Sequence, residues 1–359
     1  MSRKLLITAS TYSHIVHFHL PYIQKFHELG WEVNVACGGK ETEIPFADKV
    51  VSLSLKKSFT SPSNFKACAQ LHRLMSGNKY SLVIAHTALA SFFTRLAEVG
   101  IKPHPKTINV VHGYLFDDRT PKLKAAVLKA AELLVAPQTD LVLTMNAYDT
   151  QWAKTHRTGK TVRSIPGMGV DEKKLVPTNG HDFGFAEDDF VLVYAAEFSE
   201  RKSQATLIHM MAQLPERVKL LLPGEGALLE SCKGLAADLD VSDRVIFPGQ
   251  VKDMCNVLMQ ADASVTSSRS EGLPFNVMEA MLMGLPVIAS RVKGHVDLVE
   301  DGLTGYLCEY GDETAFAKAV GKLMDDTRLA EQMGEKGKEK AQAYTISAVF
   351  QQVMDQYLS

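Results

Sequence analysis

The sequence predicts an α/β protein built from two doubly wound, Rossmann-like domains, and three observations lead to this prediction. At 359 residues the chain exceeds the usual size of one compact core. Short apolar runs rich in Val, Ile and Leu recur between helical patterns, as expected for strands buried on both faces of a parallel sheet. The series of runs restarts near the middle of the chain, after a segment rich in Gly, Pro and charge.

The predicted strands fall into two sets of similar size. The first set comprises residues 4–10, 31–37, 49–55, 81–87, 106–113 and 141–146, and the second comprises residues 190–196, 218–224, 244–249, 263–268, 286–290 and 304–310. The Gly- and Pro-rich segment at 162–189 lies between the sets and is the best candidate for the linker.

We therefore expect an N-terminal domain over residues 1–168 and a C-terminal domain over residues 169–341. A final helical segment, residues 342–359, is expected to pack back toward the N-terminal domain. Ligands of open α/β sheets bind outside the carboxyl ends of the strands, so two such domains facing each other predict a ligand cleft between them.

The bulk composition indicates an ordinary soluble protein with 46% hydrophobic and 22% charged residues. A formal net charge of −2 gives no sign of nucleic-acid binding, so any attraction to an anionic membrane must come from local patches. The five cysteines are odd in number and scattered, which argues against a disulfide framework or a zinc site. No signal-peptide core or membrane span is evident, so we expect a cytoplasmic location, with peripheral membrane contact left open.

The segment after strand 263–268 has the features of an anion site at a helix start. Gly272 allows a tight turn, and Pro274 suits the first position of a helix that continues to about Met283. The free amides at this helix start would point at a phosphate; the predicted phosphate segment is Gly272, Leu273, Pro274, Phe275, Asn276 and Val277.

Two glutamates lie near this helix start. Neither is expected to bind the phosphate, because a carboxylate repels a group of the same charge. Glu279 lies about one helical turn in, where a carboxylate suits the two hydroxyls of a ribose. Glu271 lies on the loop and can accept hydrogen bonds from a sugar beyond the phosphates. The structural alternative is a solvated Glu279 and a Glu271 that only stabilises the helix dipole.

The sequence of this segment resembles that of family 4 of the glycosyltransferases, which are retaining enzymes of the GT-B fold. The family signature Glu-x7-Glu is matched by Glu271 and Glu279 within an E-G-x-P-x-x-x-x-E-A-M context. The surrounding sequence looks like members that build bacterial capsular polysaccharides and exopolysaccharides. The two sets of strands extend the resemblance over the whole chain.

The resemblance implies transfer of a hexose or N-acetylhexosamine from a nucleotide diphosphate sugar, with UDP as the expected nucleotide. The nucleotide sugar is then a substrate and no cofactor is expected. The implied acceptor is a hydroxyl of a glycan or of a polyprenyl-diphosphate-linked glycan. In this arrangement the N-terminal domain receives the acceptor and the C-terminal domain binds the nucleotide sugar.

A basic pair follows strand 190–196. Arg201 and Lys202 lie at a carboxyl strand end, where they could clamp a diphosphate, and the resemblance implies this role. Many family members carry Arg where this chain has Glu197, which makes Lys202 the firmer match. The alternative is a solvated basic pair.

The resemblance implies that two further loops lie on the donor side. The loop of Gly224, Glu225 and Gly226 is implied to lie beside the donor, although an ordinary left-handed turn is the simpler interpretation. Backbone groups near Val251 are implied to receive the nucleobase; the alternative is a plain strand-to-helix turn with Asp253 near the cap.

Histidines supply the candidates in the first domain. His112 ends strand 106–113 and could donate to a sugar hydroxyl, near the O6 atom by resemblance, or be a core histidine bonded to backbone. Ser13 and His14 match a subgroup of the family and are inferred to face acceptor or sugar. His17 and His19 are expected to be structural, and no metal is expected because no Cys or carboxylate joins the three histidines nearby.

An Asp-x-Asp sequence could suggest a metal-dependent transferase. Asp238 and Asp240 precede strand 244–249, so they belong to the amino edge of the sheet, the wrong edge for a ligand. We therefore expect a metal-independent enzyme.

The helical pattern at 119–137 offers a possible membrane surface. Leu123, Val127, Ala130 and Leu134 recur at helical spacing beside Lys122, Lys124 and Lys129. Such a stripe is expected to face the core, although a basic amphipathic helix can also lie on an anionic membrane.

No Ser/His/Asp or Cys/His set is evident, which fits the front-face transfer that the resemblance implies. In that reaction the phosphate of the donor takes the acceptor proton. The rivals are a nucleotide-sugar epimerase or a phosphorylase of the same fold, and a nucleotide-sugar-binding subunit without activity. The joint presence of Glu271, Lys202 and Glu279 argues against the last of these.

Overall fold

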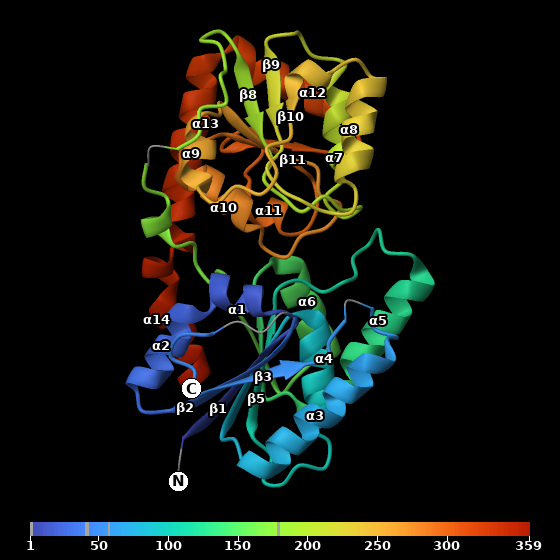
Figure 1. Ribbon diagram of the computed structural model, residues 1–359, viewed down its shortest axis with the longest axis vertical. Helices are drawn as coiled ribbons and strands as arrows, with labels where there is room; N and C mark the ends of the chain where they lie inside the picture. Colours follow the sequence, from blue (N-terminus) through green and yellow to red (C-terminus); the bar gives the residue numbers. More distant parts are fainter. Residues whose placement is uncertain (1–2, 40–42, 57, 178–179) are drawn as a thin grey trace. The chain divides into compact units, whose positions relative to one another are not determined.

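The computed structural model describes residues 3–39, 43–56, 58–177 and 180–359, which divide into two compact units (Figure 1). The N-terminal unit comprises Met1–Gly169 and Val349–Ser359. The C-terminal unit comprises Val170–Ala348. Each unit has its own parallel sheet with helices packed against it, which confirms the predicted fold class.

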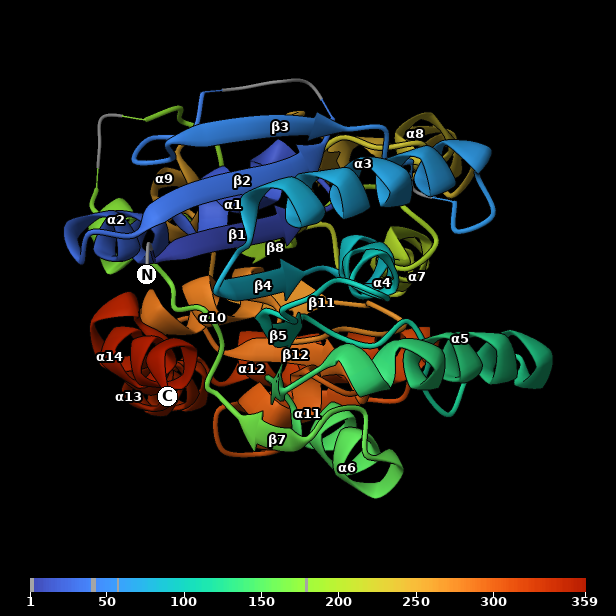
Figure 2. The same cartoon turned by 90° about the horizontal axis from the view of Figure 1, so that it is seen from below.

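Within the described residues, the N-terminal unit contains a seven-stranded sheet in the order β3-β2-β1-β4-β5-β6-β7. Every neighbouring pair is parallel, and Figure 2 shows β3, β2, β1, β4 and β5 in succession. The central strands are buried along most of their length, whereas the edge strands β3 and β7 are largely open to solvent. The strands are β1 (Lys4–Ala9), β2 (Glu32–Gly38), β3 (Lys49–Leu53), β4 (Leu82–His86), β5 (Lys106–Val111), β6 (Leu141–Thr144) and β7 (Thr161–Ser164).

Helices connect these strands, and polar side chains cap several of them. Thr11 accepts from the amide of His14 at the start of α1, and Asn146 accepts from the amide of Asp149 at the start of α6. The helices of this unit are α1 (Tyr12–Phe18), α2 (Leu20–Glu28), α3 (Pro62–Asn78), α4 (Ala88–Ala97), α5 (Lys122–Val135), η1 (Ala136–Gln138), α6 (Ala147–His156) and most of α14 (Ile346–Leu358).

The C-terminal unit has six strands among its described residues, ordered β10-β9-β8-β11-β12-β13 and again all parallel. The core of this unit is hydrophobic, with aliphatic residues such as Leu192, Leu220 and Ile288 beside buried aromatic rings. The strands are β8 (Phe190–Val193), β9 (Val218–Leu221), β10 (Val245–Ile246), β11 (Ala263–Thr266), β12 (Val287–Ser290) and β13 (Gly305–Cys308).

The helices of the C-terminal unit include a long pair, α12 and α13, near its end. Asp312 and Asp326 cap these two helices by accepting from the amides of Ala315 and Leu329. The full set is η2 (Glu172–Lys174), α7 (Gln204–Met211), α8 (Leu229–Asp238), η3 (Ser242–Arg244), α9 (Met254–Met259), α10 (Phe275–Leu282), α11 (His295–Leu298), α12 (Glu313–Asp325), α13 (Thr327–Ala341) and η4 (Gln342–Tyr344).

The C-terminal helix α14 belongs to the core of the N-terminal unit. Tyr22 of α2 stacks on Phe350 with ring centroids 5.2 Å apart, and its hydroxyl donates to the carbonyl of Met168 at 2.9 Å. Tyr357 is buried against Tyr22 and Phe26. The C-terminal segment that belongs to the N-terminal unit begins at Val349, whereas the sequence led us to expect it from position 342.

The predicted linker at 162–189 contains more structure than its composition suggested. Its first residues belong to β7, which pairs with β6 as an edge strand, and residues 172–174 form η2. Residues 178–179 of this segment lie outside the described residues. The strand was missed because an exposed edge strand has no continuous apolar run.

The prediction that the α5 stripe faces the core is wrong. Leu123, Val127 and Leu134 are 80%, 61% and 67% exposed, and Ala130 is exposed as well. The inward face of α5 carries Ala125, Glu132 and Val135 instead. Glu132 is buried there because it pairs with the buried Arg95 at 2.9 Å.

The cysteines and the lengths of the helices bear on two expectations from the sequence. All five cysteines, each in the described part of the chain, are free. Across the described residues, no helix has the length and apolar character needed to cross a membrane.

Strand order reverses once in each sheet, and this position locates the candidate site. In the N-terminal unit the reversal lies between β1 and β4, and in the C-terminal unit it lies between β8 and β11. The loops that leave adjacent strands in opposite directions open a crevice at the carboxyl edge of such a sheet. The residues predicted to bind ligand follow these four strands or their neighbours, except Val251, which follows β10 at the edge of the sheet.

Candidate functional site

The carboxylate of Glu271 connects the loops that follow β8 and β11. Its Oε1 atom lies 2.7 Å from Lys202 Nζ, and its Oε2 atom lies 2.8 Å from Arg201 Nη1. Ser268 Oγ donates a third hydrogen bond to Oε1 at 2.6 Å. The side chain of Glu271 is 8% exposed and that of Lys202 is 13% exposed, so this is a largely buried ion pair.

Burial and charge act in opposite directions on this carboxyl group. Burial alone would raise the pKa of Glu271, but the positive charges of Lys202 and Arg201 outweigh it and lower the pKa to about 2. Burial likewise opposes the charge on Lys202, and the Glu271 carboxylate more than offsets it, so the pKa of Lys202 is raised. Glu271 and Lys202 are therefore both ionised near neutral pH.

A network of hydroxyls holds the two loops together. Tyr194 Oη lies 2.6 Å from Ser268 Oγ, and Ser267 Oγ donates to the carbonyl oxygens of Lys202 and Ser203 at 3.2 and 2.8 Å. The amide of Arg269 donates to the carbonyl of Arg201 at 2.8 Å. These contacts fix the Glu271 carboxylate against both cations, a function that sequence reasoning missed for Tyr194, Ser267 and Ser268.

A second support comes from the loop that precedes α11. Gly294 has a φ of 81°, and a Cβ atom there would lie 2.7 Å from the carbonyl oxygen of Gly272 and 3.1 Å from Glu271 Cβ. His295 is fully buried, and its Nδ1 lies 2.8 Å from the carbonyl oxygen of Ser290. Burial lowers the pKa of His295 to about 4, so it is neutral at pH 7. Sequence reasoning missed both residues, since a lone Gly-His pair carries no distinctive spacing.

The helix start after Glu271 lies where the sequence placed it, with one correction. Pro274 is the N-cap residue of α10 and not its first helical residue, so α10 begins at Phe275. Asn276 and Val277 are in the first turn, where the helix itself provides no acceptor for their amides. Leu273 and Pro274 are buried, which anchors this turn to the unit.

Glu279 lies one turn into α10 and is half-buried. Burial raises the pKa of its carboxyl group to about 7, and the charge of Lys174 counteracts only part of this shift. The carboxyl group therefore changes charge near neutral pH, unlike that of Glu271.

The loop of Gly224, Glu225 and Gly226 extends the sheet beyond β9. The amide of Phe198 donates to the carbonyl of Glu225 at 2.9 Å, and Glu225 itself is exposed. A Cβ atom at Gly226 would lie 2.3 Å from the carbonyl oxygen of Phe198, so the glycine is required by close backbone approach. Both glycines have positive φ, 146° at Gly224 and 155° at Gly226, as a glycine turn allows, but the turn is not a helix start, because α8 begins only at Leu229.

The segment at Val251 connects β10 to α9. Val251 is half-buried against an apolar cluster, and Asp253 caps α9 by accepting from the amide of Asn256 at 3.1 Å. This cap is what a plain strand-to-helix turn predicts. The contact of Val251 with a nucleobase stays a prediction. Asp238 and Asp240 both precede η3 and β10, at the amino edge of the sheet as expected.

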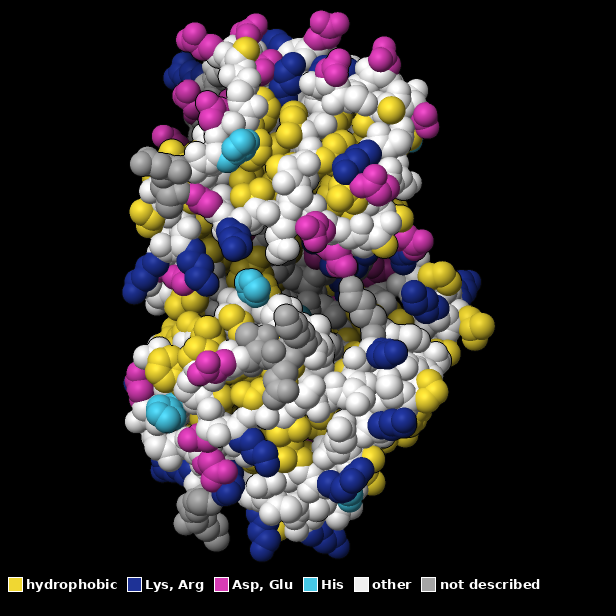
Figure 3. All heavy atoms as spheres, in the orientation of Figure 1, with side chains coloured by type: hydrophobic (Ala, Val, Ile, Leu, Met, Phe, Trp, Pro, Cys, Tyr) yellow, Lys and Arg dark blue, Asp and Glu magenta, His cyan; other side chains and the backbone are white. Residues whose placement is uncertain are grey.

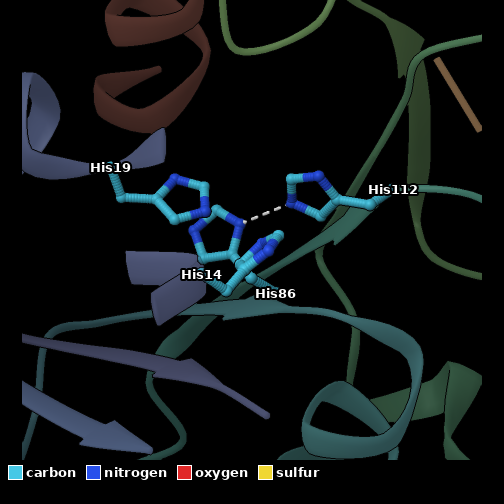
Figure 4. A group of neighbouring side chains, drawn as sticks. All are labelled: His14, His19, His86 and His112. Carbon is cyan, nitrogen blue, oxygen red and sulfur yellow. Dashed lines mark hydrogen bonds between the residues drawn. The ribbon is translucent and has the colours of Figure 1, made fainter. Parts of the chain in front are cut away.

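Four histidines of the N-terminal unit gather at the carboxyl edge of its sheet (Figure 4). His112 directly follows β5, and its Nε2 lies 3.1 Å from Nδ1 of His86, the last residue of β4. His14 and His19 meet these two rings, with centroids 4.6 Å (His14 to His112) and 3.8 Å (His19 to His86) apart. Sequence reasoning missed His86, although it ends a predicted strand next to that of His112.

Two other candidates of the N-terminal loop lie beside this cluster. Ser13 Oγ lies 3.0 Å from Thr11 Oγ1, and the carbonyl of Ser13 bonds to Nδ1 of His17 at 2.6 Å. His17 therefore stays outside the cluster, as expected for a structural residue. His19 joins the cluster, which the sequence did not indicate.

Comparison with known proteins identifies the family. A family model described as "Glycosyl transferase 4-like" matches residues 4–146, and one described as "Glycosyl transferases group 1" matches residues 177–340. A Bacillus subtilis (strain 168) protein named "Putative glycosyltransferase EpsD" is 32% identical to this chain, over 99% of the chain and 97% of the relative. The chain belongs to the group 1 glycosyltransferases.

More distant matches agree with this assignment. An Escherichia coli protein named "UDP-Gal:alpha-D-GlcNAc-diphosphoundecaprenol alpha-1,3-galactosyltransferase" is 24% identical over 83% of this chain and 81% of its own. The crystal structure of Anabaena Alr3699/HepE in complex with UDP and glucose has a TM-score of 0.80 at 19% identity, covering 99% of each chain. The glycosyltransferase thus has a GT-B fold and acts in glycan biosynthesis.

The contact between Gly294 and the Glu271 loop predicts a specific defect in Gly294→Ala. The strained φ should cost about 1–2 kcal/mol of unfolding free energy, and the new Cβ should displace the loop and lower the transfer rate. Gly302→Ala is the matched control, because Gly302 has a φ of 76° with nothing within 4 Å. Denaturant unfolding and transfer assays on both variants test this; equal transfer rates would contradict it.

The raised pKa of Glu279 predicts a pH-dependent stability. Between the unfolded pKa of about 4.5 and the folded pKa of about 7, the folded protein keeps a proton that the unfolded chain has lost. The free energy of unfolding should therefore fall as pH rises through this window, by at most about 1.4 kcal/mol per pH unit. Denaturant unfolding across this range should show that Glu279→Gln flattens the slope; an unchanged slope would disprove the assignment.

Proposed function

We propose that this glycosyltransferase moves a hexose or N-acetylhexosamine from a UDP-linked sugar to a hydroxyl of a glycan, with retention at the anomeric carbon. The observation that carries the proposal is the Glu271 carboxylate held between Lys202 and Arg201 beside the start of α10. This arrangement places two cations and first-turn amides near a carboxylate in one unit. Together they suit a diphosphate with a sugar attached to it.

The roles of the residues follow from their charges. Lys202, Arg201 and the first-turn amides would stabilise negative charge on the departing diphosphate. The ionised Glu271, which only accepts hydrogen bonds, would accept from sugar hydroxyls while keeping both cations in place. Glu279, in its carboxylate form, would accept from the ribose hydroxyls.

The transfer step needs no protein nucleophile. The bond between the anomeric carbon and the diphosphate oxygen breaks, and the acceptor oxygen forms a new bond to the same face of that carbon. The acceptor proton passes to the departing diphosphate, which balances the charge. His112, whose buried ring is neutral because burial lowers its pKa, would orient the sugar as a hydrogen-bond partner.

The nucleotide and the acceptor are proposed from relatives. UDP is named in the solved complex of the Anabaena protein, and a diphosphoundecaprenol-linked sugar is named in the Escherichia coli relative. We propose the same chemistry here, with a glycan or polyprenyl-diphosphate-linked glycan as acceptor in surface polysaccharide synthesis. The reaction would take place at the cytoplasmic face of the membrane and would need no metal ion.

The site assignment predicts that Glu271→Ala and Lys202→Ala each lose transfer by at least about 100-fold while remaining folded. Binding of UDP-sugars, measured by thermal shift, should weaken in the same variants, since a ligand at about 100 times its Kd adds about 2.7 kcal/mol. Lys219→Ala is the control, because it removes a lysine of the same unit that pairs with Asp189 at 3.4 Å. Full transfer in both site variants would overturn the assignment.

We also propose that the exposed face of α5 contacts an anionic membrane surface. Leu123, Val127 and Leu134 lie on this face with Lys122 and Lys124, and Figure 3 shows hydrophobic and basic side chains side by side over α5. Lysines and arginines also outnumber acidic residues over 1–169, although the whole chain has a net charge of −2. Such a face can bury its apolar side in the headgroup boundary.

Co-sedimentation with vesicles containing phosphatidylglycerol tests this contact. Wild type should bind, and the binding should weaken with added salt. The double variant Leu123→Glu, Val127→Glu should lose it. Val99→Glu, which changes another exposed apolar residue of the same unit, should not. Equal sedimentation of all three proteins would rule out α5 as the membrane surface.

A further inference from the structure

Four histidines from separate segments of the N-terminal unit converge at one point. His14 lies on α1, His19 between α1 and α2, His86 at the end of β4 and His112 after β5. One ring nitrogen of each lies within 4.8 Å of one from every other histidine. Figure 4 shows the four rings gathered at the carboxyl edge of the sheet.

The hydrogen bonds among the described residues do not satisfy this cluster. His86 and His112 bond to each other at 3.1 Å, but neither ring nitrogen of His19 has a partner in this part of the chain, although the residue is 1% exposed. Nε2 of His14 is buried without a partner as well. Each buried polar atom left this way costs about 1–3 kcal/mol, so a cluster of four core histidines is a costly arrangement by itself.

We propose that His14, His19, His86 and His112 form a binding site for one divalent first-row transition-metal ion, with zinc as the probe. Imidazole nitrogen is a preferred ligand of this class of ion, and four such ligands complete a tetrahedral site. The cluster contains no carboxylate among the described residues, which disfavours Mg²⁺ and Ca²⁺.

The geometry is close to what zinc requires. With Zn–N distances of about 2.0–2.1 Å, ligand nitrogens in a tetrahedral site are about 3.4 Å apart. The nitrogens of His86 and His112 are already 3.1 Å apart, and the widest separation in the cluster is 4.8 Å. Metal binding would therefore have to draw the most distant pair closer by about 1.4 Å. Burial also keeps the imidazoles neutral, the form that binds metal.

Metal binding here has a consequence for His112. Its Nε2 cannot bind a metal ion and a sugar hydroxyl at the same time. The ion would therefore be an inhibitor that competes for this histidine, separate from the transfer chemistry, which we propose to be metal-independent. The binding proposal itself does not depend on the proposed function, because it can be measured without any substrate.

Titration of the chelator-stripped, dialysed protein with zinc chloride tests the site. Calorimetry and metal analysis should give one ion per chain, and Co²⁺ should show the visible absorption of a four-coordinate site. His19→Gln and His86→Gln should each weaken zinc binding by at least about tenfold, because even the loss of a side chain that only supports a ligand typically costs about 10–100-fold. His17→Gln is the matched control on α1, because His17 bonds to the carbonyl of Ser13 and lies outside the cluster.

The outcomes separate the proposals. A wild-type protein that binds no zinc, or binds it no better than the folded His19→Gln and His86→Gln variants, would overturn the site. An equal loss of zinc binding in His17→Gln would also overturn it. Circular dichroism of each metal-free variant checks folding.

In transfer assays, zinc should inhibit wild type more than His19→Gln, and EDTA should restore the rate. Transfer that requires a metal would instead contradict the proposed metal-independent mechanism and leave the binding result standing.

Discussion

The interaction on which the candidate site depends is the bridge between Glu271 and the two cations of the neighbouring loop. Lys202 and Glu271 are both largely buried, and neither would remain charged there alone. Removing one partner of such a pair leaves an uncompensated charge and typically costs about 3–5 kcal/mol. The loops after β8 and β11 are therefore coupled: each is held in place by a charge that the other carries.

This coupling follows from the strand order. β8 and β11 are neighbours in the sheet although β9 and β10 separate them in sequence, because the strand order reverses at this point. The loops that leave the two strands thus meet at one edge, where Tyr194, Ser267 and Ser268 tie them together. The rigid part of the site is consequently the carboxylate with its cations, and the adjoining α10 start contributes donors that the helix itself does not use.

The pKa values of the two signature glutamates are shifted in opposite directions. Two cations face Glu271 and lower the pKa of its carboxyl group to about 2. Burial raises the pKa of the Glu279 carboxyl group to about 7, because the charge of Lys174 offsets only part of this effect. In the N-terminal unit the same edge of the sheet collects neutral histidines in place of charges. Each unit thus presents a polar cluster at its strand-order reversal, but with different chemistry: a charged one, for which we propose a diphosphate, and a neutral one, for which we propose a metal ion.

The sequence by itself determined the fold class, the positions of most strands and the Glu271–Glu279 segment. Buried parallel strands leave continuous apolar runs, and a helix start after a strand leaves a local pattern of Gly, Pro and acidic residues. It did not reveal β7, because an exposed edge strand has no continuous apolar run, and it did not reveal the outward orientation of the α5 stripe, because helical spacing does not tell whether an apolar face meets the core or solvent. Only the tertiary structure decided that Arg201 and Lys202 pair with Glu271, that Gly294 packs on the same loop, and that His86 joins His14, His19 and His112. These contacts join residues far apart in the chain, and strand order in the sheet, which no local pattern records, brings them together.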